Sequence, residues 1–284
     1  MKEIIIDVGG TNIDVYTTDE LDYFSLTKKI KTPNSYLELK VEIKKIVNNL
    51  KPSIISLGLP GPVNTNHFDN VFCPPLNFDV YFADIYKIDP SIHIKIMNDL
   101  AALSILLKNS KNDLLCQIGK IIKTRPEILM TLGTSFGFAY LNFNNSGNNH
   151  SCKSLEIAHQ RIIFNDYFFR KIQENIFLHQ LYKFKYKDLL SGEGFQWTKK
   201  NFNNLIKANF KIFSIDEFQG SFEHLYIYLM CEIISPLIKM SSPNNLCLLL
   251  HGGVVKAINI EHQYIFKHVF ERENIESLRI VKSK

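Results

Sequence analysis

The sequence lacks the features that mark several common protein classes. No apolar run approaches the roughly 20 residues that cross a bilayer, and an acid at Asp7 interrupts the apolar stretch near the N-terminus. We therefore expect neither a membrane span nor a secretory signal. The five cysteines are odd in number and no two are close, which argues against a disulfide framework and a zinc ribbon. These absences predict a cytoplasmic protein with reduced thiols.

Strongly concentrated charge is also missing. The net charge is +5, and the Lys and Arg residues are spread along the chain. The densest basic runs, residues 28–31 and 183–187, do not combine the concentration and the interleaved aromatics of a nucleic-acid surface. We interpret both runs as solvated basic faces, and we expect neither a nucleic acid nor a membrane as a partner.

Short apolar runs that end in glycine or polar turns alternate with segments of helical periodicity. Strands are expected at residues 3–8, 13–17, 22–27, 54–57, 92–97, 116–122, 128–132 and 246–250. Helices are expected at residues 35–50, 100–108, 162–181, 198–208 and 222–240, the last interrupted at Pro236, with a surface loop at residues 142–150. This alternation predicts an α/β fold, in which ligands bind outside the strand ends. No internal repeat is visible.

Two glycine-bearing turns follow apolar strands and suit phosphate. The first holds Asp7, Gly9, Gly10, Thr11 and Asn12, and the second holds Gly133, Thr134, Ser135 and Gly137. Glycine lets backbone N–H groups approach an anion without a Cβ in the way, and Thr or Ser adds a hydroxyl donor. The carboxylate of Asp7 suits Mg²⁺, held through water. Neither turn is a Walker loop, because no Gly-Lys-Ser/Thr follows. A plain hairpin turn is the alternative for each.

A candidate catalytic base stands at Asn98-Asp99, where a strand meets a helix. Phosphoryl transfer to an alcohol needs a group that accepts the hydroxyl proton and orients the oxygen toward the γ-phosphate. A carboxylate can do both. The alternative is that Asp99 only caps the helix that follows.

Three further motifs are ambiguous individually. Glu156 and His159 fall on one face of a helix or turn, where they suit sugar hydroxyls or form a solvated pair. A Ser-Gly-Glu-Gly segment follows Leu190. Gly252 and Gly253 follow a buried strand, where paired glycines let a flat adenine approach the backbone closely.

Taken in order, these motifs resemble those of bacterial glucokinases, and the resemblance runs from residue 4 to about residue 255. The segments DVGGTN and LGTSFG resemble the family's two phosphate motifs, and NDLAA resembles the segment with its catalytic aspartate. The segments GLPGPV and LEIAH resemble elements of the sugar pocket. The remaining matches are LLSGEG, which resembles a Leu-Ser-Gly-Pro-Gly element, and GGV, which resembles the glycines of the adenosine motif.

The resemblance implies a two-domain, actin-like ATPase (ribonuclease H-like) α/β fold, with nucleotide and sugar in the interdomain cleft. It implies a small N-terminal domain at residues 1–106 and a large C-terminal domain at residues 107–284 that lacks the family's final helix. The implied cofactors are ATP and Mg²⁺. Glucose or a related hexose is the implied substrate, phosphorylated at its 6-hydroxyl, and a homodimer is the implied assembly.

Residue roles follow from the same resemblance. Asp99 is implied to be the general base toward the 6-hydroxyl. Other sugar hydroxyls are assigned to Asn98, Glu156, His159 and Asn77. The two glycine turns are assigned to the phosphates, with Mg²⁺ at Asp7, and the remaining nucleotide contacts are assigned to Gly252 and Gly253.

The sequence departs from the family pattern at several positions. Ser135 and Ala158 each replace a glycine, and a serine at φ > 0 would cost about 1 kcal/mol. Lys187 replaces a second sugar-binding glutamate, unless the register slips so that Asp188 takes that place. The chain also ends where a final helix is expected to begin.

These departures leave a second function open, that of a divergent sugar- or nucleotide-binding regulator with little or no kinase activity. The related repressor/kinase family, which phosphorylates sugars such as N-acetylmannosamine, is disfavoured. That family carries a Cys-rich zinc motif after its sugar-binding histidine, whereas only Cys152 lies near His159 here. The helix-turn-helix of its repressors has no counterpart ahead of Asp7.

Overall fold

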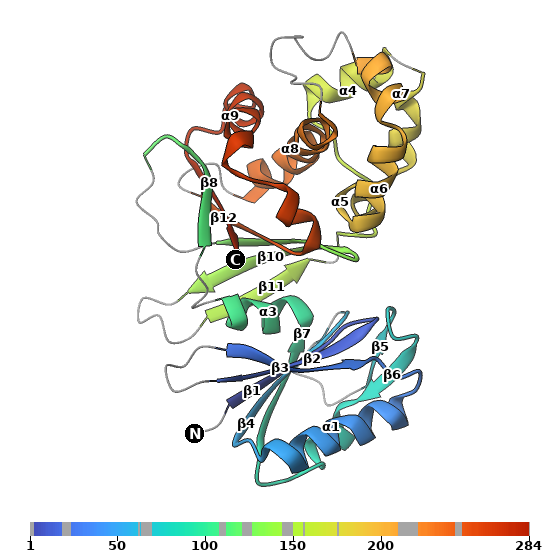
Figure 1. The fold of residues 1–284 in the computed structure, drawn as a ribbon, viewed down its shortest axis with the longest axis vertical. Coiled ribbons are helices and arrows are strands. Elements are labelled where there is room, and N and C mark those ends of the chain that lie inside the picture. The colour runs from blue at the N-terminus through green and yellow to red at the C-terminus, as the bar shows by residue number, and fades with distance from the viewer. Residues whose placement is uncertain are drawn as a thin grey trace. The chain divides into compact units, whose positions relative to one another are not determined.

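A computed structural model describes most of the chain as two compact units (Figure 1). The described residues are 3–18, 24–61, 63, 70–107, 112–120, 127–143, 150–155, 157–174, 176–209, 221–241 and 246–283. One unit is Met1–Ser110 with Asn149–Ser154, and the other is Lys111–Asn148 with Leu155–Lys284. Among the described helices, none is long and apolar enough to span a bilayer.

A five-stranded sheet forms the centre of the first unit, in the order β3-β2-β1-β4-β7. The chain runs antiparallel through β1, β2 and β3, and then β4 and β7 add parallel to β1. A separate hairpin joins β5 to β6. The strand bounds are β1 Glu3–Val8, β2 Asn12–Thr18, β3 Phe24–Lys31, β4 Ile54–Leu59, β5 Asn70–Cys73, β6 Phe78–Tyr81 and β7 His93–Asn98.

The period-2 alternation of β1 gives this sheet two different faces. Ile4, Ile6 and Val8 belong to one core with the apolar side of α1 (Tyr36–Leu50). Ile5 and Asp7 project from the opposite face, which α3 (Asp99–Leu107) covers. The short helix α2 (Phe82–Tyr86) follows β6. The alternation of β1 therefore puts Asp7, the acid near its carboxyl end, on the α3 side of the sheet.

The second unit repeats the strand plan of the first. It contains five strands of a six-stranded sheet with the order β11-β10-β9-β12-β13-β8, in which nearly all of the edge strand β11 belongs to the segment counted with the first unit. As in the first sheet, an antiparallel hairpin (β9-β10) is followed by strands that add in parallel to the first of them (β12, then β13). The two units thus share a strand order, although no repeat is visible in the sequence. The bounds are β8 Asn112–Ile118, β9 Ile128–Leu132, β10 Phe136–Phe143, β11 His150–Leu155, β12 Leu246–His251 and β13 Leu278–Ser283.

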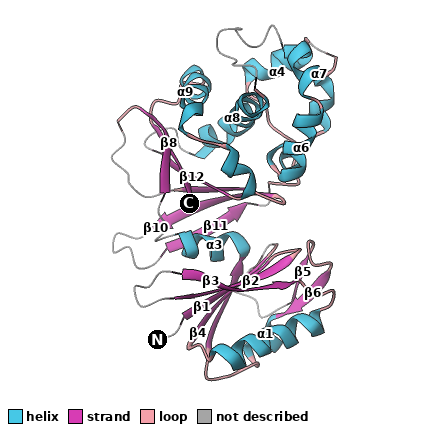
Figure 2. Cartoon of the chain, in the orientation of Figure 1, coloured by secondary structure: helices cyan, strands magenta, loops and turns pink. Residues whose placement is uncertain are grey.

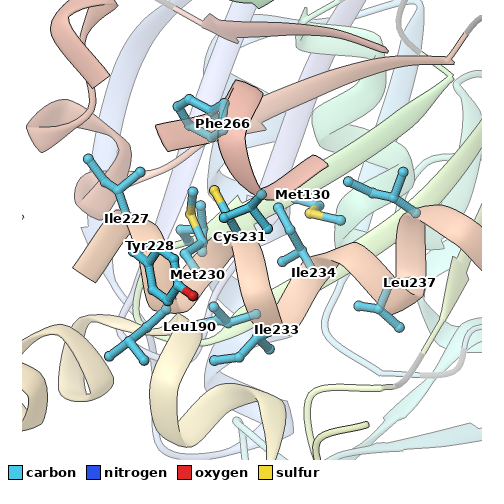
Figure 3. Close-up of a cluster of buried hydrophobic side chains, with 14 of the residues drawn as sticks. Met130, Leu190, Ile227, Tyr228, Met230, Cys231, Ile233, Ile234, Leu237 and Phe266 are labelled. Carbon is cyan, nitrogen blue, oxygen red and sulfur yellow. The ribbon is translucent and has the colours of Figure 1, made fainter. Parts of the chain in front are cut away.

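Helices α4 to α9 of the second unit lie on one side of its sheet (Figures 1 and 2). Their apolar side chains meet in a single core, in which residues of α8 contact Phe266 of α9, Leu190 of α5 and Met130 of β9 (Figure 3). The helical bounds are α4 Asp166–Gln173, η1 Leu178–Lys183, α5 Tyr186–Leu190, α6 Gly192–Lys200, α7 Phe202–Asn209, α8 Phe222–Ser241, η2 Gly253–Ala257, η3 Ile260–His262 and α9 Gln263–Arg272.

Helix α8 corrects one expectation, because it continues through Pro236. A proline removes the N–H that would bond the carbonyl four residues earlier, here the carbonyl of Glu232. That oxygen instead accepts hydrogen bonds from Ser235 Oγ at 3.1 Å and from Asn165 Nδ2 at 3.4 Å. Because side chains satisfy the freed carbonyl, the helix is not interrupted.

Other boundaries also differ from those expected. The strand expected at residues 116–122 is β8, which begins earlier and ends at Ile118. The helix expected at residues 162–181 is divided into α4 and η1, and the one expected at residues 198–208 is divided into α6 and α7 by a turn at Asn201. Part of the expected loop at residues 142–150 is strand, since β10 reaches Phe143 and β11 begins at His150. No sequence pattern predicted β5, β6, β11, β13, α2, α5 or α9.

Candidate functional site

Candidate site residues of the first unit lie at the carboxyl ends of three adjacent parallel strands. β1 ends in Asp7-Val8, β4 contains Gly58, and β7 ends in Asn98, which is followed directly by Asp99 of α3. The register pairs Asp7 with Gly58. This edge is where α/β sheets bind ligands, so the topology brings together Asp7, Asn98 and Asp99.

The glycine turn between β1 and β2 is closed by its own backbone and by Thr32. The Gly9 N–H donates to the Asn12 carbonyl at 2.9 Å, and the Thr32 N–H donates to the Thr11 carbonyl at 3.0 Å. Thr32 Oγ1 also donates to the Gly9 carbonyl at 2.6 Å. These bonds use carbonyls of the turn and leave the N–H groups of Gly10 and Thr11 pointing to other partners or solvent.

Gly10 fits closely against the neighbouring turn at residues 74–77. A Cβ on Gly10 would lie 3.1 Å from Pro75 Cβ and 3.2 Å from the Pro75 carbonyl oxygen. Asn77 is exposed at the end of that turn with φ 59°, and its N–H donates to the Cys73 carbonyl at 2.9 Å. The structure therefore places Asn77 in a left-handed turn position beside the first glycine turn, a conformation that asparagine tolerates well.

Asp7 lies in an unfavourable electrostatic environment for a carboxylate. Burial, followed by the charges of Asp99 and Asp14, raises the pKa of Asp7 from 3.8 to about 7, against a lowering effect of Lys29. Asp14 is the cross-strand partner of Asp7, and its Oδ2 pairs with Lys29 Nζ at 3.2 Å. Its other oxygen, Oδ1, is buried without a hydrogen-bond partner in the described part of the chain. The three acids thus concentrate more negative charge than the one lysine offsets.

Asn98 fixes the start of α3. Its Nδ2 donates to the Gly61 carbonyl at 2.8 Å, and its Oδ1 accepts the Leu100 N–H at 2.9 Å. Asp99 Oδ1 accepts the same N–H at 2.9 Å. Asn98 and Asp99 therefore share the cap of α3, and we interpret Asn98 mainly as a residue that positions Asp99. Its sugar contact stays a prediction, for which its second amide hydrogen is the available donor.

Gly58 lets α3 approach the sheet. A Cβ at this position would lie 2.7 Å from Ala102 Cβ and 3.4 Å from Asp99 Cα. A contact under 3 Å between two carbons is repulsive, so any larger residue would move the helix and the half-buried Asp99 with it.

The second glycine turn lies beside the start of α6. The Gly133 N–H donates to the Ser135 carbonyl at 3.1 Å, and the Gly133 carbonyl accepts the Gly192 N–H at 2.6 Å. Ser191 caps α6 by accepting the Gly194 N–H at 3.3 Å. A Cβ on Gly133 would meet nothing within 4 Å. This turn therefore offers open backbone next to a helix N-terminus, an arrangement suited to an anion.

Gly252 and Gly253 follow β12 and differ from each other. Gly252 has φ 110°, and a Cβ there would lie 2.6 Å from the Leu132 carbonyl oxygen. It is therefore required where the ends of β12 and β9 meet. A Cβ on Gly253 would meet nothing within 4 Å, so this backbone is open on one side, as the adenosine assignment needs.

The expected sugar segment is only partly described. Glu156 lies outside the described residues, and His159 is exposed in a turn. The Lys187 N–H donates to the Ala158 carbonyl at 3.0 Å, so the segment is bonded to the start of α5. Asp188, the alternative to Lys187, caps α5 through its Oδ2, which accepts the Lys185 N–H at 2.8 Å, and its contact with a sugar stays a prediction.

The strain anticipated at Ser135 is absent. The described residues with positive φ are Lys51, Asn77, Asn274, Gly61, Gly119 and Gly252. Ser135 is not one of them, and it is exposed. The expectation of a backbone penalty at this position was wrong, because the turn uses a conformation that serine adopts freely.

Among the comparisons with known proteins, only the one with solved structures found matches. No protein-family model and no curated protein matches the chain. A glucokinase from an Antarctic psychrotroph matches with a TM-score of 0.68 at 15% identity, over 100% of this chain and 94% of that one. The Balamuthia mandrillaris glucokinase, solved with glucose, matches with a TM-score of 0.65 at 16% identity, over 100% of this chain and 89% of that one. The chain has the two-domain actin-like ATPase fold.

This fold is shared with the ROK sugar kinases. A ROK family glucokinase from Streptomyces griseus, solved with glucose and AMPPNP, matches with a TM-score of 0.54 at 14% identity, over 100% of this chain and 94% of that one. Because identities this low show the fold alone, the likeness does not separate glucokinases from the repressor/kinase family. The choice between activities depends on the residues of the site.

The residues of this actin-like ATPase fold are compatible with Mg-ATP. In the described segments, no group of three or more His, Cys, Asp or Glu side chains is arranged to hold a metal ion directly. Mg²⁺ commonly keeps several waters and is bound by one or two carboxylates plus substrate phosphates. The concentration of acids around Asp7 suits that water-mediated mode, because a divalent cation would offset the charge repulsion. The open backbone at Gly133 and Gly253 suits phosphate and adenosine.

Two residues of the first site were missed in the sequence. Asp14 lies across the hairpin from Asp7, and counting back from the Gly-Gly turn along both strands would have indicated it. Thr32 bonds the turn from the end of β3, and no local pattern identifies such a long-range contact.

Proposed function

We propose that the protein is an ATP-dependent sugar kinase that phosphorylates a hexose at its 6-hydroxyl. The observation that carries the proposal is the position of Asp99, a half-buried carboxylate at the carboxyl end of β7, electrostatically coupled to Asp7 beside a glycine turn. This arrangement supplies an acceptor for a hydroxyl proton next to a binding place for phosphate. The likeness in fold to glucokinases supports the same assignment.

In this proposal Asp99 accepts the proton of the 6-hydroxyl and orients its oxygen toward the γ-phosphate. Asn98 holds Asp99 in place through the cap of α3 and its bond to Gly61. Backbone N–H groups of the two glycine turns bind the phosphates, and Gly252 and Gly253 admit the adenosine. Bound Mg²⁺ neutralises charge on the phosphate oxygens, and Asp7 would hold it through water.

The first test is an assay of purified protein for ADP release from Mg-ATP with a panel of hexoses, beside Asp99→Asn. We expect sugar-dependent ADP release, and a fall in kcat of at least about 10³-fold in the variant, within the range for a lost general base together with its positioning role. Phosphorus NMR of the product should locate the phosphate on the 6-oxygen.

Asp84→Asn is a matched control, since Asp84 is a surface aspartate of the same unit paired with Lys40 at 2.9 Å. It should retain wild-type kcat. A wild-type protein that releases no ADP with any hexose, or an Asp99→Asn variant as active as wild type, would contradict the proposal.

A divergent sugar- or nucleotide-binding regulator is the second candidate. Lys187 favours it, because a lysine bonded to the sugar segment stands where a glutamate would be expected to hold a hydroxyl. Calorimetric binding of a sugar or of AMPPNP by a protein without turnover would select this candidate.

A cytoplasmic location belongs to the same proposal. All five cysteines are free thiols, and burial raises the pKa of Cys73 and Cys116 to about 12. Such thiols stay protonated and unreactive, as suits a reducing compartment.

A further inference from the structure

The segment with His159 is joined to a basic part of the chain. The Lys187 N–H donates to the Ala158 carbonyl at 3.0 Å, and the Tyr186 N–H donates to the Gln160 carbonyl at 3.1 Å. An antiparallel bridge then pairs Arg161 with Lys185. Four basic side chains are therefore gathered along one short ladder, and they come from His159, Arg161, Lys185 and Lys187. We call these four residues the basic ladder.

The basic ladder carries uncompensated positive charge. Arg161 and Lys185 are direct cross-strand partners, and like charges in that relation repel. Within the described part of the chain, no ion pair or side-chain hydrogen bond involves any of the four side chains. The acid beside them, Asp188, is committed to the Lys185 backbone N–H at 2.8 Å.

The ladder is also connected to the second glycine turn. Helix α5 begins one residue before Lys187, and the turn after it bonds Gly192 to Gly133 at 2.6 Å. Lys187 is half-buried, whereas His159, Arg161 and Lys185 are exposed. Lys187 is thus the least exposed member of the ladder and the one that belongs to α5, the helix followed by the turn at Gly192, so it is the member best placed to select an anion.

We propose that the sugar accepted by this protein carries an anionic group, a carboxylate or a phosphate, that binds the basic ladder through Lys187. This inference rests on the proposed kinase function and narrows its substrate to a hexose with a free 6-hydroxyl and an acidic substituent elsewhere. A neutral hexose would leave the repulsion within the ladder unrelieved, whereas an anion relieves it and gains a charge-assisted hydrogen bond.

Matched pairs of sugars test the proposal. Glucose 1-phosphate is compared with methyl glucoside, and N-acetylmuramate with N-acetylglucosamine, so that each pair keeps the 6-hydroxyl and differs in charge. Binding is measured by calorimetry and turnover by ADP release. We expect at least about tenfold tighter binding of one anionic member than of its neutral partner, decreasing at high salt, and the pair that shows it tells phosphate from carboxylate.

Variants assign the effect to Lys187. Lys187→Gln should reduce the preference for the anion by about tenfold, while the affinity for AMPPNP stays unchanged. Lys183→Gln is the control, because Lys183 is an exposed lysine of η1 outside the ladder. It removes the same charge and should leave the preference intact.

The outcomes separate this inference from the proposed function. Equal binding of charged and neutral partners, no binding of either, or a loss in Lys187→Gln of AMPPNP affinity alone would overturn the inference. Selective binding of an anionic sugar that never leads to ADP release would support the inference and contradict the kinase function.

Discussion

The two units share a strand order, but the hairpins at corresponding places in them carry different side chains. In the first, the hairpin β1-β2 places Asp7 opposite Asp14. In the second, the hairpin β9-β10 places Thr131 opposite Gly137 at the corresponding step from the turn. Both turns are closed by a glycine N–H, from Gly9 at 2.9 Å and from Gly133 at 3.1 Å.

Because of this difference, two hairpins of the same topology suit different chemical groups of a ligand. The first hairpin concentrates carboxylates, which suit a cation and a proton acceptor. The second contains no carboxylate from Ile128 to Phe143. Its open backbone lies beside the N-terminus of α6, which suits anionic oxygens, although Glu193 stands in the first turn of that helix. Phosphoryl transfer needs both kinds of group.

The largest expected effect on stability comes from replacing a glycine in or directly after a parallel strand. Gly58 lies within β4, and Gly252 directly follows β12. A Cβ on Gly252 would collide with the Leu132 backbone and the residue has φ 110°, whereas a Cβ on Gly58 would meet the Ala102 methyl group at 2.7 Å. We expect Gly252→Ala to cost about 2–4 kcal/mol of unfolding free energy, and Gly58→Ala less.

Urea unfolding of the variants measures this difference. Adding Ala102→Gly to Gly58→Ala removes the colliding methyl group, so the double variant should lose less stability than the sum of the two single variants, although glycine inside α3 itself costs about 1 kcal/mol. No side-chain change at Leu132 offers the same rescue for Gly252→Ala. Gly253→Ala is the control, with open space around its Cβ, and should stay within about 0.5 kcal/mol of wild type. A Gly252→Ala protein as stable as that control would refute the required close approach.

The charge difference between the hairpins predicts a pH effect of intermediate size. The folded protein raises the pKa of Asp7 from 3.8 to about 7, so between these values the unfolded chain has lost a proton that the folded chain still holds. Folding stability therefore falls as pH rises through this window. Without Mg²⁺ or nucleotide, Asp7→Asn should be more stable than wild type by about 1–3 kcal/mol at pH 8, after allowance for solvent screening.

Thermal and urea unfolding between pH 4 and pH 8.5 would measure this effect. The advantage of Asp7→Asn should grow with pH and be small near pH 4. Thr131→Val, at the corresponding place in the second hairpin, should show no such trend. An Asp7→Asn variant that is destabilised equally at all pH values would indicate a structural role for Asp7 in place of an electrostatic one.

Many strands and helices of this fold could be predicted from local sequence patterns. Continuous apolar runs bounded by glycine turns predicted β1, β4, β9 and β12, and helical periodicity after Pro33 predicted α1, whose N-cap Ser35 accepts the Glu38 N–H. Those signals depend on neighbouring residues alone. The order of the motifs along the chain then implied the actin-like fold, which the structural likeness bears out.

The remainder depended on contacts between distant residues. The continuity of α8 through Pro236 needs Asn165, which is far away in sequence. The repeated strand order is a property of pairing and leaves no shared sequence. Within the candidate site, Thr32 and Asp14 act through the register of β1, β2 and β3. Local patterns locate the turns, but they do not say which distant side chains complete them.

The smallest expected effect concerns Ser135, where the family pattern has glycine. Because Ser135 does not have positive φ, replacing it with glycine relieves no strain and increases the freedom of the unfolded chain. We expect Ser135→Gly to lower the unfolding free energy by a few tenths of a kcal/mol to about 1 kcal/mol. Thr11→Gly, in the first turn, should behave alike, because Thr11 also lies outside the positive-φ residues. A stabilised Ser135→Gly would mean that serine strains the second turn, and the two turns would then differ in backbone conformation as well as in charge.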